Sequence, residues 1–391
     1  MKRQPDGVLY LTCKNFKDGK LDLSKASYII ESDYSKHFKS ESNALTKPTA
    51  GDVLFSIIGT IGEPYLYKDE DFFGISSSVS ILRPNNSLSL HSSYLYYWIK
   101  NREFQKAVIG MKGGVAQGYL SLDMIRALPI RYPSLPSQEK IAFILSAYDD
   151  LIENNRRRIQ LLEQAARLLY REWFVYFRFP GHEHVTITDG VPEGWEKKTL
   201  SKVLFELESG GRPKGGAQED GIPSVGAENV IGIGQYDYSK EKYVPETYFK
   251  SMRKGIIQSR DVLVYKDGAN IGRSSYFGDG YPHETCAVNE HVFILRASPQ
   301  VGQNLLYFWV ERDETRQHIA NLNANTAQPG VSQSKLKTLD FVVPQDRITS
   351  IFNETVEPIV RQIFLLAKEI QALINARDLL LPRLMNGEVA V

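Results

Sequence analysis

Two short clusters have residue types that could support catalysis, but each lacks the partners that such chemistry needs. Glu196-Lys-Lys198 matches the end of a nuclease E-x-K motif, but no convincing acidic partner precedes it. His182-Glu-His184 has a spacing that could bind a metal ion, but the sequence offers no evident third ligand. We interpret the first cluster as the start of a domain and the second as a solvated linker.

Motifs for nucleotide or methyl-donor chemistry are also absent from the sequence. The chain has no Asn/Asp-Pro-Pro-Tyr methyltransferase motif, no G-x-G-x-x-G opening a βαβ unit and no G-x-x-x-x-G-K-[ST] phosphate loop. The glycine-rich segment Gly210–Gly216 (GGRPKGG) resembles either a phosphate-cradling loop or a flexible basic loop, and we favour contact with a phosphate backbone over a plain turn. We therefore expect no catalytic residue, no bound metal and no cofactor.

Side chains that can contact DNA occur in the polar loops between the predicted strands and helices. Asn, Gln and Arg can pair with the edges of adenine or guanine, and Lys contacts phosphate. Any one such residue alone is more often plain surface. The candidates, chosen by loop position and side-chain type, are Lys14, Asn15, Lys112 and Gln117 in the first half and Asn229, Lys266, Asn270, Arg273 and Gln328 in the second.

These loops belong to two similar halves of the chain. Gly51–Gly62 (GDVLFSIIGTIG) returns as Arg260–Gly272 (RDVLVYKDGANIG), and Tyr94–Ile99 (YLYYWI) returns as Leu305–Val310 (LLYFWV). The tryptophans of the second pair are 211 residues apart. Because the units of solenoid proteins reach only about 50 residues, this period indicates domain duplication.

The duplication divides the chain into four predicted parts. Module one comprises residues 1–133 and is followed by a spacer helix, residues 134–180. Module two comprises residues 181–344 and is followed by a second spacer helix, residues 345–391. Within each module, short β segments and helices alternate without βαβ regularity, which predicts an α+β fold.

The pattern within the modules predicts several elements. Strands are expected at Val53–Ile58, Ser78–Leu82, Val262–Tyr265 and His291–Leu295, and aromatic-rich helices at Tyr94–Phe104 and Asn304–Ile319. Ser121 and Ser332 each follow a Gly/Gln/Asn loop and are well placed to cap a short helix.

The two spacer segments have the spacing of a heptad repeat. Apolar residues recur in alternating steps of three and four from Ile141 to Trp173, interrupted by Asn155. A second series extends from Ile359 to Leu384 and is interrupted by Arg377. Each polar residue either fixes the register of the helix pair or lies solvated at the edge of the seam, and the sequence leaves both interpretations open.

The order of modules and helices predicts an antiparallel pair with coiled-coil-like packing. The first helix must deliver the chain to module two, and the second can pair with it only by returning. Each pattern covers nearly 40 residues, or roughly 60 Å. We therefore expect pseudo-two-fold symmetry, with the modules set to contact DNA about one turn, roughly 34 Å, apart.

Composition excludes several other classes of protein. The chain has 391 residues, a formal net charge of +1 and two cysteines, Cys13 and Cys286. These features argue against a histone-like coating protein and against a disulfide framework. No apolar segment approaches the 18 residues of a membrane span, and the first residues lack the apolar core of a signal peptide. We expect a cytoplasmic protein.

Four segments resemble a known family. Leu169–His182 (LYREWFVYFRFPGH), Val191–Glu196 (VPEGWE), Leu379–Glu388 (LLLPRLMNGE) and Pro136–Ile141 (PSQEKI) resemble the helical regions and joins of specificity subunits of type I restriction-modification systems.

The resemblance implies a non-catalytic subunit in which two target-recognition domains each read one half of a split site in double-stranded DNA. It also implies that two methyltransferase (modification) subunits, which use S-adenosylmethionine, bind the helices, and that separate restriction/translocase subunits cleave. The alternatives are the specificity partner of a fused restriction-methylation enzyme and a degenerate protein-interaction scaffold.

The two modules differ at their starts. Module two opens with Trp195–Asp220, ahead of a Gly-Ile-Pro segment that matches Gly7-Val-Leu in module one. Module one has no equivalent of Trp195–Asp220, so we expect its N-terminal part to be missing. We place the missing piece beside the C-terminus of the second helix.

Overall fold

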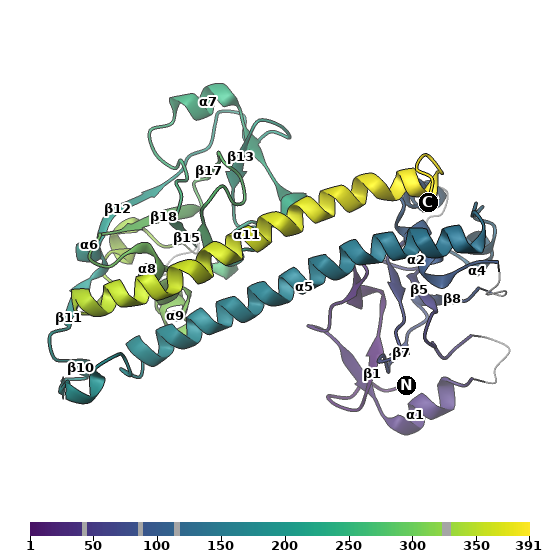
Figure 1. Ribbon diagram of the computed structural model, residues 1–391, viewed down its shortest axis with the longest axis horizontal. Coiled ribbons are helices and arrows are strands. Elements are labelled where there is room, and N and C mark those ends of the chain that lie inside the picture. The colour runs from purple at the N-terminus through teal and green to yellow at the C-terminus, as the bar shows by residue number, and fades with distance from the viewer. Residues whose placement is uncertain (41–44, 85–88, 113–117, 323–329) are drawn as a thin grey trace. The chain divides into compact units, whose positions relative to one another are not determined.

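The computed structural model describes residues 1–40, 45–84, 89–112, 118–322 and 330–391 (Figure 1). The chain folds into two compact units. Unit 1 comprises Met1–Leu151 and Leu373–Val391, and unit 2 comprises Ile152–Ala372. Each unit therefore combines one copy of the repeat with a section of each long helix.

Unit 2 contains a four-stranded antiparallel sheet and a smaller three-stranded sheet. The larger sheet has the order β12-β18-β15-β16, and the smaller has the order β14-β13-β17. In the smaller sheet, β13 is antiparallel to β14 and parallel to β17. The strands are β12 Leu204–Ser209, β13 Ile222–Val225, β14 Tyr243–Val244, β15 Asp261–Tyr265, β16 Ser274–Phe277, β17 Ala287–Val288 and β18 Val292–Ala297.

Unit 1 repeats both sheets with the same strand directions. Its larger sheet has the order β6-β5-β8, and its smaller sheet has the order β4-β1-β7, with β1 antiparallel to β4 and parallel to β7. The four strands predicted from the sequence are confirmed, with small shifts at their ends. The strands are β1 Val8–Leu11, β4 Ser27–Ile29, β5 Val53–Ser56, β6 Pro64–Leu66, β7 Gly74–Ile75 and β8 Val79–Leu82.

Shorter elements complete the two units. In unit 1 they are η1 Cys13–Asn15, β2 Phe16–Lys17, β3 Lys20–Leu21, α1 Glu31–His37, α2 Ser92–Lys100, α3 Arg102–Lys112 and α4 Leu122–Arg126. In unit 2 they are η2 His182–His184, β9 Ile187–Thr188, β10 Val191–Pro192, β11 Glu196–Thr199, α6 Leu200–Val203, η3 Tyr238–Lys240, α7 Glu246–Ser251, η4 Gly268–Asn270, α8 Gln303–Glu311, α9 Asp313–Asn321, α10 Gln333–Leu336 and β19 Asp340–Val343.

The prediction of a single aromatic-rich helix in each module was wrong, because each is broken in two. Asn101 separates α2 from α3, and Arg312 separates α8 from α9; both have extended backbone angles. Asn101 is buried, and its side-chain oxygen accepts a hydrogen bond from the backbone N–H of Glu103 (3.4 Å), at the start of α3. The Asn101 side chain thus caps the start of α3, in place of the backbone hydrogen bonds of one continuous helix.

The predicted serine caps are confirmed in both units. The Ser121 hydroxyl accepts a hydrogen bond from the Met124 N–H (3.2 Å), at the start of α4. The Ser332 hydroxyl accepts one from the Lys335 N–H (3.3 Å), at the start of α10. The same four-residue geometry therefore starts the corresponding helix in each copy.

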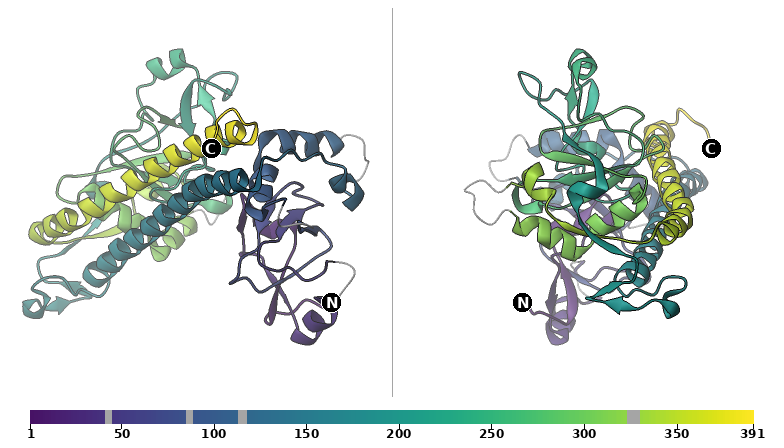
Figure 2. Two further views of the ribbon diagram at one scale, coloured as in Figure 1. Left: turned by 45° about the vertical axis from the view of Figure 1, so that its right-hand side comes forward. Right: turned by 90° about the vertical axis from the view of Figure 1, so that its left-hand side faces the viewer.

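The two predicted spacer helices are α5 Leu135–Phe174 and α11 Asp346–Met385. In unit 1 the early part of α5 packs with the late part of α11, as Ile141 and Leu145 share a core with Leu384. In unit 2 the late part of α5 packs with the early part of α11, where the Tyr170 and Phe352 ring centroids are 6.0 Å apart. The helices are therefore antiparallel in each unit, and their unit 2 sections run side by side in all views (Figure 2).

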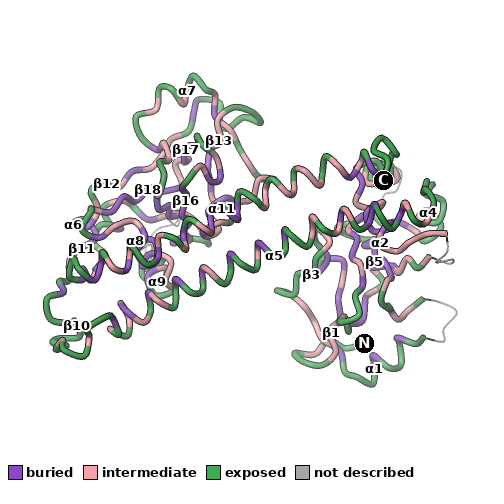
Figure 3. The backbone as a smooth tube through the Cα atoms, viewed as in Figure 1, coloured by how far each residue is buried: buried purple, intermediate pink, exposed green. Residues whose placement is uncertain are grey.

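Burial along α5 follows the predicted heptad seam. Ile141, Leu145, Ile152, Ile159 and Ala166 are all buried, and buried and exposed positions alternate along the helix (Figure 3). Asn155 is 4% exposed, which excludes a solvated position for it at the edge of the seam.

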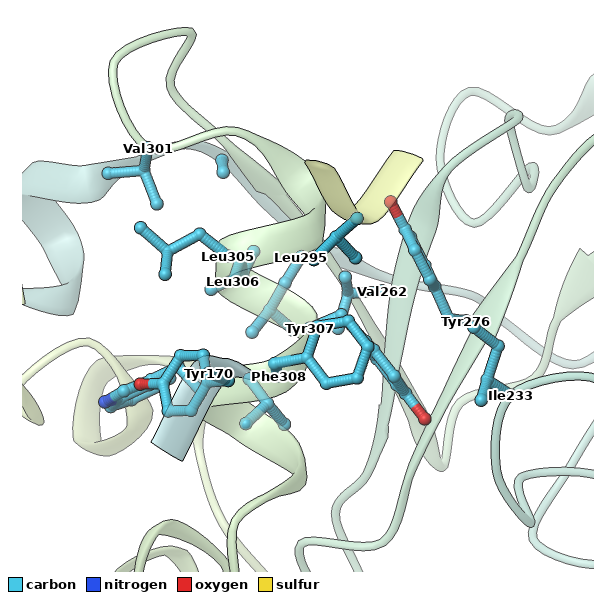
Figure 4. Packing of buried hydrophobic residues seen from close by; sticks show 14 of the residues in the cluster. Tyr170, Ile233, Val262, Tyr276, Leu295, Val301, Leu305, Leu306, Tyr307 and Phe308 are labelled. Atoms are coloured by element: carbon cyan, nitrogen blue, oxygen red, sulfur yellow. The ribbon is translucent and has the colours of Figure 1, made fainter. Parts of the chain in front are cut away.

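The main core of unit 2 lies between its larger sheet, α8 and the two long helices. Tyr276 of β16 stacks on Tyr307 of α8, with ring centroids 4.9 Å apart (Figure 4). The Tyr276 hydroxyl donates to Oδ1 of Asn304 (2.8 Å), while Val262 and Leu295 pack in the same core. Burial of a large apolar side chain contributes about 1.5–3 kcal/mol, so this core anchors the loops at the strand ends.

Candidate nucleic-acid interface

Three loops of unit 2 meet at the end of β15. The Val331 N–H donates to the Lys266 carbonyl (2.9 Å), and the Lys266 N–H donates to the His291 carbonyl (3.1 Å). The His291 ring Nδ1 lies 2.7 Å from a carboxylate oxygen of Asp267. These bonds hold the loop after β15, the turn before β18 and the segment before α10 as one surface.

Asn229 shapes a fourth loop beside these three. The loop after β13 is joined to them because the Asn289 N–H donates to the Val225 carbonyl (3.0 Å). Asn229 itself is 2% exposed: its Oδ1 accepts from the Gly226 N–H (3.3 Å), and its Nδ2 donates to the Asp237 carbonyl (3.0 Å). Both ends of the amide are occupied, so Asn229 positions its loop.

Asn270 and Arg273 occupy a tight loop between β15 and β16. Asn270 is exposed, and its side-chain oxygen accepts a hydrogen bond from Nη2 of Arg273 (2.9 Å). Gly272 has φ +83° and faces the Arg316 backbone, where an added Cβ would lie 3.1 Å from the carbonyl oxygen. The loop therefore presents a guanidinium held by an amide, a combination suited to hydrogen-bonding a base edge.

Lys266, unlike the exposed Lys14, lies beside an aromatic ring. Its ammonium lies 5.1 Å from the centroid of the Phe293 ring, close enough for a cation–π contact. The side chain is half-buried, so the aromatic ring limits its range of positions.

A polar cleft of about 620 Å³ adjoins Asn229. Arg212 lines it and pairs with Glu290 (Nε–Oε1 2.9 Å), which places the glycine-rich Gly210–Gly216 segment at this surface. Lys240 and Lys242 also line the cleft, together with acidic side chains. These two lysines were not predicted from the sequence, although their alternation with Glu241 just before β14 was a usable signal.

The rings of Tyr236, Tyr238 and His283 form an aromatic cluster beside this cleft. Burial raises the pKa of the Tyr238 phenol to about 12, so the hydroxyl remains a hydrogen-bond donor near neutral pH. Glu241 is held by the Tyr243 hydroxyl (2.6 Å) and by the His283 ring. Because its carboxylate is already engaged, Glu241 acts as part of the wall.

The loops of unit 1 meet in a comparable way. The Thr60 hydroxyl donates to the Cys13 carbonyl (2.8 Å), and the Leu120 N–H donates to the Ile57 carbonyl (2.9 Å). The loop after β5 is therefore joined both to η1 and to the segment before α4. Lys14, on η1, is exposed at this surface.

Asn15 has the same local role as Asn229. It is 4% exposed; its Oδ1 accepts from the Thr12 N–H (2.9 Å), and its Nδ2 donates to the Asp22 carbonyl (2.9 Å). It therefore holds the loop that carries Lys14.

The side chains of three predicted residues lie outside the described part of the chain. Lys112 is the last residue of α3, and its side chain lies outside the described part. Gln117 and Gln328 both lie outside the described residues.

The clusters with catalytic residue types have ordinary structural positions. Glu196-Lys-Lys198 lies in β11, and His182-Glu-His184 forms η2. Cys13 and Cys286 are buried free thiols. Within the described ranges, no group of three or more His, Cys, Asp or Glu side chains could hold a metal ion. In the same part of the chain, no helix is long and apolar enough to cross a membrane.

Comparisons with known proteins agree with this duplicated architecture. Residues 11–164 match the type I restriction modification DNA specificity domain. The type I restriction enzyme MjaIX specificity subunit of Methanocaldococcus jannaschii is 26% identical over 308 residues, covering 77% of this chain and 69% of that protein. The HindI specificity subunit of Haemophilus influenzae is 23% identical over 419 residues, covering 87% and 86%.

A solved structure shows the same fold. The S subunit of a type I restriction-modification system from M. genitalium superposes with a TM-score of 0.59 at 16% identity, over 98% of this chain and 90% of that chain. The duplicated α+β modules and the paired helices are thus the fold of that S subunit. The chain is similar in sequence and in fold to specificity subunits of type I restriction-modification systems.

Proposed function

We propose that this chain reads a split sequence in double-stranded DNA, with one half-site contacted by each unit. The observation that carries the proposal is the convergence of equivalent loops in both units, after β5 in unit 1 and after β15 in unit 2. Because the two loop surfaces have different side chains on the same scaffold, the two half-sites should differ in sequence.

The exposed residues of these loops have distinct proposed roles. Asn270 and Arg273 are assigned to base edges, and Lys14 and Lys266 to phosphates. Asn15 and Asn229 remain in the proposed interface as the residues that fix the loop shapes. Lys112, Gln117 and Gln328 keep the roles that their residue types suggest, phosphate for Lys and base edges for Gln.

The paired helices α5 and α11 are the proposed binding surface for two methyltransferase subunits. Phe143, Leu151, Leu161 and Leu168 on α5 are exposed apolar side chains, which supports a protein-binding surface there. The methyltransferase would supply S-adenosylmethionine chemistry, and restriction/translocase subunits would join the assembly. Since the target is genomic DNA, we assign the complex to the cytoplasm.

Methylome sequencing tests the proposal directly. The chain is co-expressed with its methyltransferase partner in a host without background adenine methylation, and the methylated motif is read from the genome. We expect a split motif with a fixed spacer. A continuous motif, or no methylation in an assembled complex, would overturn the proposal.

Variants of one loop then test the division of labour. Asn270→Ala and Arg273→Ala should change the half-site read by unit 2 and leave the other half-site intact. Lys202→Ala, an exposed lysine on α6 away from these loops, is the matched control and should leave the motif unchanged. Lys266→Ala should weaken binding to all sequences and reduce its salt dependence.

A further inference from the structure

A small polar pocket of unit 2 lies beside the loop that carries Arg273. It has a volume of about 370 Å³ and lies between α5, the loop after β13, the start of β16, the end of α8 and α9. Its charged lining consists of Glu163, Arg167, Arg273, Glu311 and Arg316. Three guanidinium groups and two carboxylates thus line one pocket, which gives it an excess of positive charge.

Both carboxylates of the pocket are engaged by the same arginine. Nη2 of Arg167 lies 2.7 Å from Oε1 of Glu163 and also pairs with Glu311. Neither Arg273 nor Arg316 forms an ion pair with a carboxylate of the described residues. Two positive charges of the pocket are therefore left for an anion from outside the chain.

Arg316 also has an unused hydrogen-bond donor. Its Nε is buried and has no hydrogen-bond partner within the described part of the chain. A buried donor without an acceptor is unfavourable, and the parallel N–H groups of a guanidinium match the oxygens of a phosphate group. Arg316 therefore has the capacity for an oxygen acceptor that its own fold does not supply.

The contact between α9 and the loop after β15 does not itself require an arginine. Gly272 of this loop packs on the backbone of Arg316. In unit 1 the residue 211 positions before Arg316 is Gln105, and its Nε2 donates to the Gly62 carbonyl (2.8 Å). A neutral side chain makes the same helix-to-loop contact there, so the positive charge of Arg316 is available for another role.

The excess positive charge is specific to unit 2. In unit 1, Glu63 follows the loop glycine at the position of Arg273, and its carboxylate accepts a hydrogen bond from the Asp18 N–H (2.9 Å). Since Gln105 stands at the position of Arg316, these two positions carry a formal charge of −1 in unit 1 and +2 in unit 2. An anion is therefore attracted to this place in unit 2 and repelled from it in unit 1.

We propose that Arg316 binds a phosphate of the DNA backbone next to the bases read by Arg273. The assignment rests on the proposed function, because it takes the anion from the DNA that the unit 2 loops contact. Both guanidinium groups line one pocket, so they reach neighbouring parts of one DNA strand. Phosphate contacts fix the register of a protein on the duplex, so Arg316 positions the half-site for Arg273.

Salt-dependent DNA binding tests the role of Arg316 in the complex assembled with the methyltransferase partner. The probe is a duplex that carries the motif found by methylome sequencing. Arg316→Gln, which introduces the residue type of Gln105, should weaken binding about three- to tenfold. It should also reduce the slope of log affinity against log salt by about 0.9, the value for one phosphate contact.

Two further variants separate loss of the contact from loss of charge or fold. Arg316→Lys keeps the positive charge and should retain most of the salt slope. Lys202→Gln removes one positive charge from an exposed position on α6 and should leave affinity and slope unchanged.

Uncharged linkages in the DNA then identify the phosphate. Duplexes are prepared with one methylphosphonate at a time along both strands of the unit 2 half-site. At one position the substitution should weaken binding of the native complex about as much as Arg316→Gln does. The same duplex should bind the Arg316→Gln complex no more weakly than unmodified DNA does.

Each contrary result has a defined meaning. An unchanged salt slope in Arg316→Gln would overturn the inference, as would losses that add at every linkage. Inorganic phosphate alone is titrated into the full chain by calorimetry: binding that Arg316→Gln abolishes, with DNA binding unaltered, would identify a site for free phosphate and overturn the backbone assignment. Failure of the native complex to bind DNA would refute the proposed function as well, whereas an unchanged slope refutes only this inference.

Discussion

Units 1 and 2 contain the same two sheets, but the same ion pair is enclosed in one and half-open in the other. Asp261 and Arg296 in unit 2 are both almost fully buried beneath β12. Asp52 in unit 1 is equally buried, whereas its partner Arg83 is 37% exposed. The comparison shows that one arginine–aspartate pair can lie in the interior of one sheet and at the edge of the other on the same strand scaffold.

A second difference lies where each module meets the long helices. In unit 1, Lys100 of α2 faces Asp149 of α5 (3.6 Å). Glu311 of α8, at the equivalent position 211 residues later, pairs with Arg167 of α5 in unit 2. The module carries the positive charge in unit 1 (Lys100) and the negative charge in unit 2 (Glu311). A module packed on the other module's section of α5 would therefore meet a like charge. Such repulsion favours the correct pairing of modules and helices.

The largest expected effect comes from removing the two arginines. Arg296→Met should lower the unfolding free energy of unit 2 by about 3–5 kcal/mol, because Asp261 and Glu208 would be left buried without a cation. Arg83→Met should cost unit 1 less, about 1–2 kcal/mol, since water reaches its carboxylate partner through the open edge. Hydrogen exchange in increasing denaturant, followed on peptides from each unit, measures both losses. Equal losses would mean that the covering strand contributes nothing to the ion pair.

The buried asparagines should behave alike in the two units. Asn15→Ala and Asn229→Ala should each cost about 2 kcal/mol, because each removes two hydrogen bonds and leaves buried backbone groups unpaired. Chemical denaturation of each unit measures this cost. Asn270→Ala is the exposed control and should change stability by less than about 0.5 kcal/mol. If the buried variants kept full stability and lost DNA binding, their role would be base reading.

The reversed contacts predict different pH dependences for the two units. Burial raises the pKa of Glu311 to about 7, with the Arg167 guanidinium opposing the shift. Since this folded-state pKa lies above the ordinary value of 4.5, the associated stability is present below about pH 4.5 and is lost as the pH rises through 7. Unit 2 should therefore lose roughly 1–2 kcal/mol, or about 3–6 °C in Tm, between pH 5 and pH 8.

The corresponding contact in unit 1 should lack this loss, because the pKa of its carboxylate, Asp149, shifts in the opposite direction. The pKa of Asp149 is lowered: burial raises it, but Lys100 and Arg377 outweigh that effect. The stability from Asp149 is therefore constant above its ordinary pKa of 3.8. Glu311→Gln should flatten the profile of unit 2 in calorimetric scans across this range. A slope that persists in this variant would assign it to another group.

The smallest expected effect is that of the helix caps. Ser121→Ala and Ser332→Ala should each cost about 1 kcal/mol, because each leaves one N–H at a helix start without its acceptor. The two losses should match within error, since the cap geometry is the same in both units. Thermal denaturation measures them, with the serine-to-threonine variants as controls that retain a hydroxyl.

Most elements that repeat along the chain could be predicted from local patterns. The strands after Gly51 and Arg260, the serine caps and the long helices all have periodic or capping signals that depend on near neighbours in sequence. The breaks at Asn101 and Arg312 were missed, since helical propensity continues across both residues. Whether the extended backbone forms there depends on packing of the flanking helices, which is a tertiary effect.

The candidate loops were found from the sequence, but the roles of individual residues were not. Asn15 and Asn270 are the same residue type in similar loop positions. Asn15 is buried with both ends of its amide bonded, whereas Asn270 is exposed. The lysines at 240 and 242 join the cleft because the β13–β14 loop folds back beside the glycine-rich segment. Neither outcome follows from the local sequence alone, because each depends on how the chain folds around the residue.

The sequence by itself determined the duplication and the heptad seam of the helices. Each of these follows from residue identity and spacing along one chain. The tertiary structure decided which sheet edge β12 covers in unit 2 and which carboxylates Arg296 and Arg83 contact. These depend on strand order and cross-strand register, which bring together residues distant in sequence and thereby set their burial and charge environment.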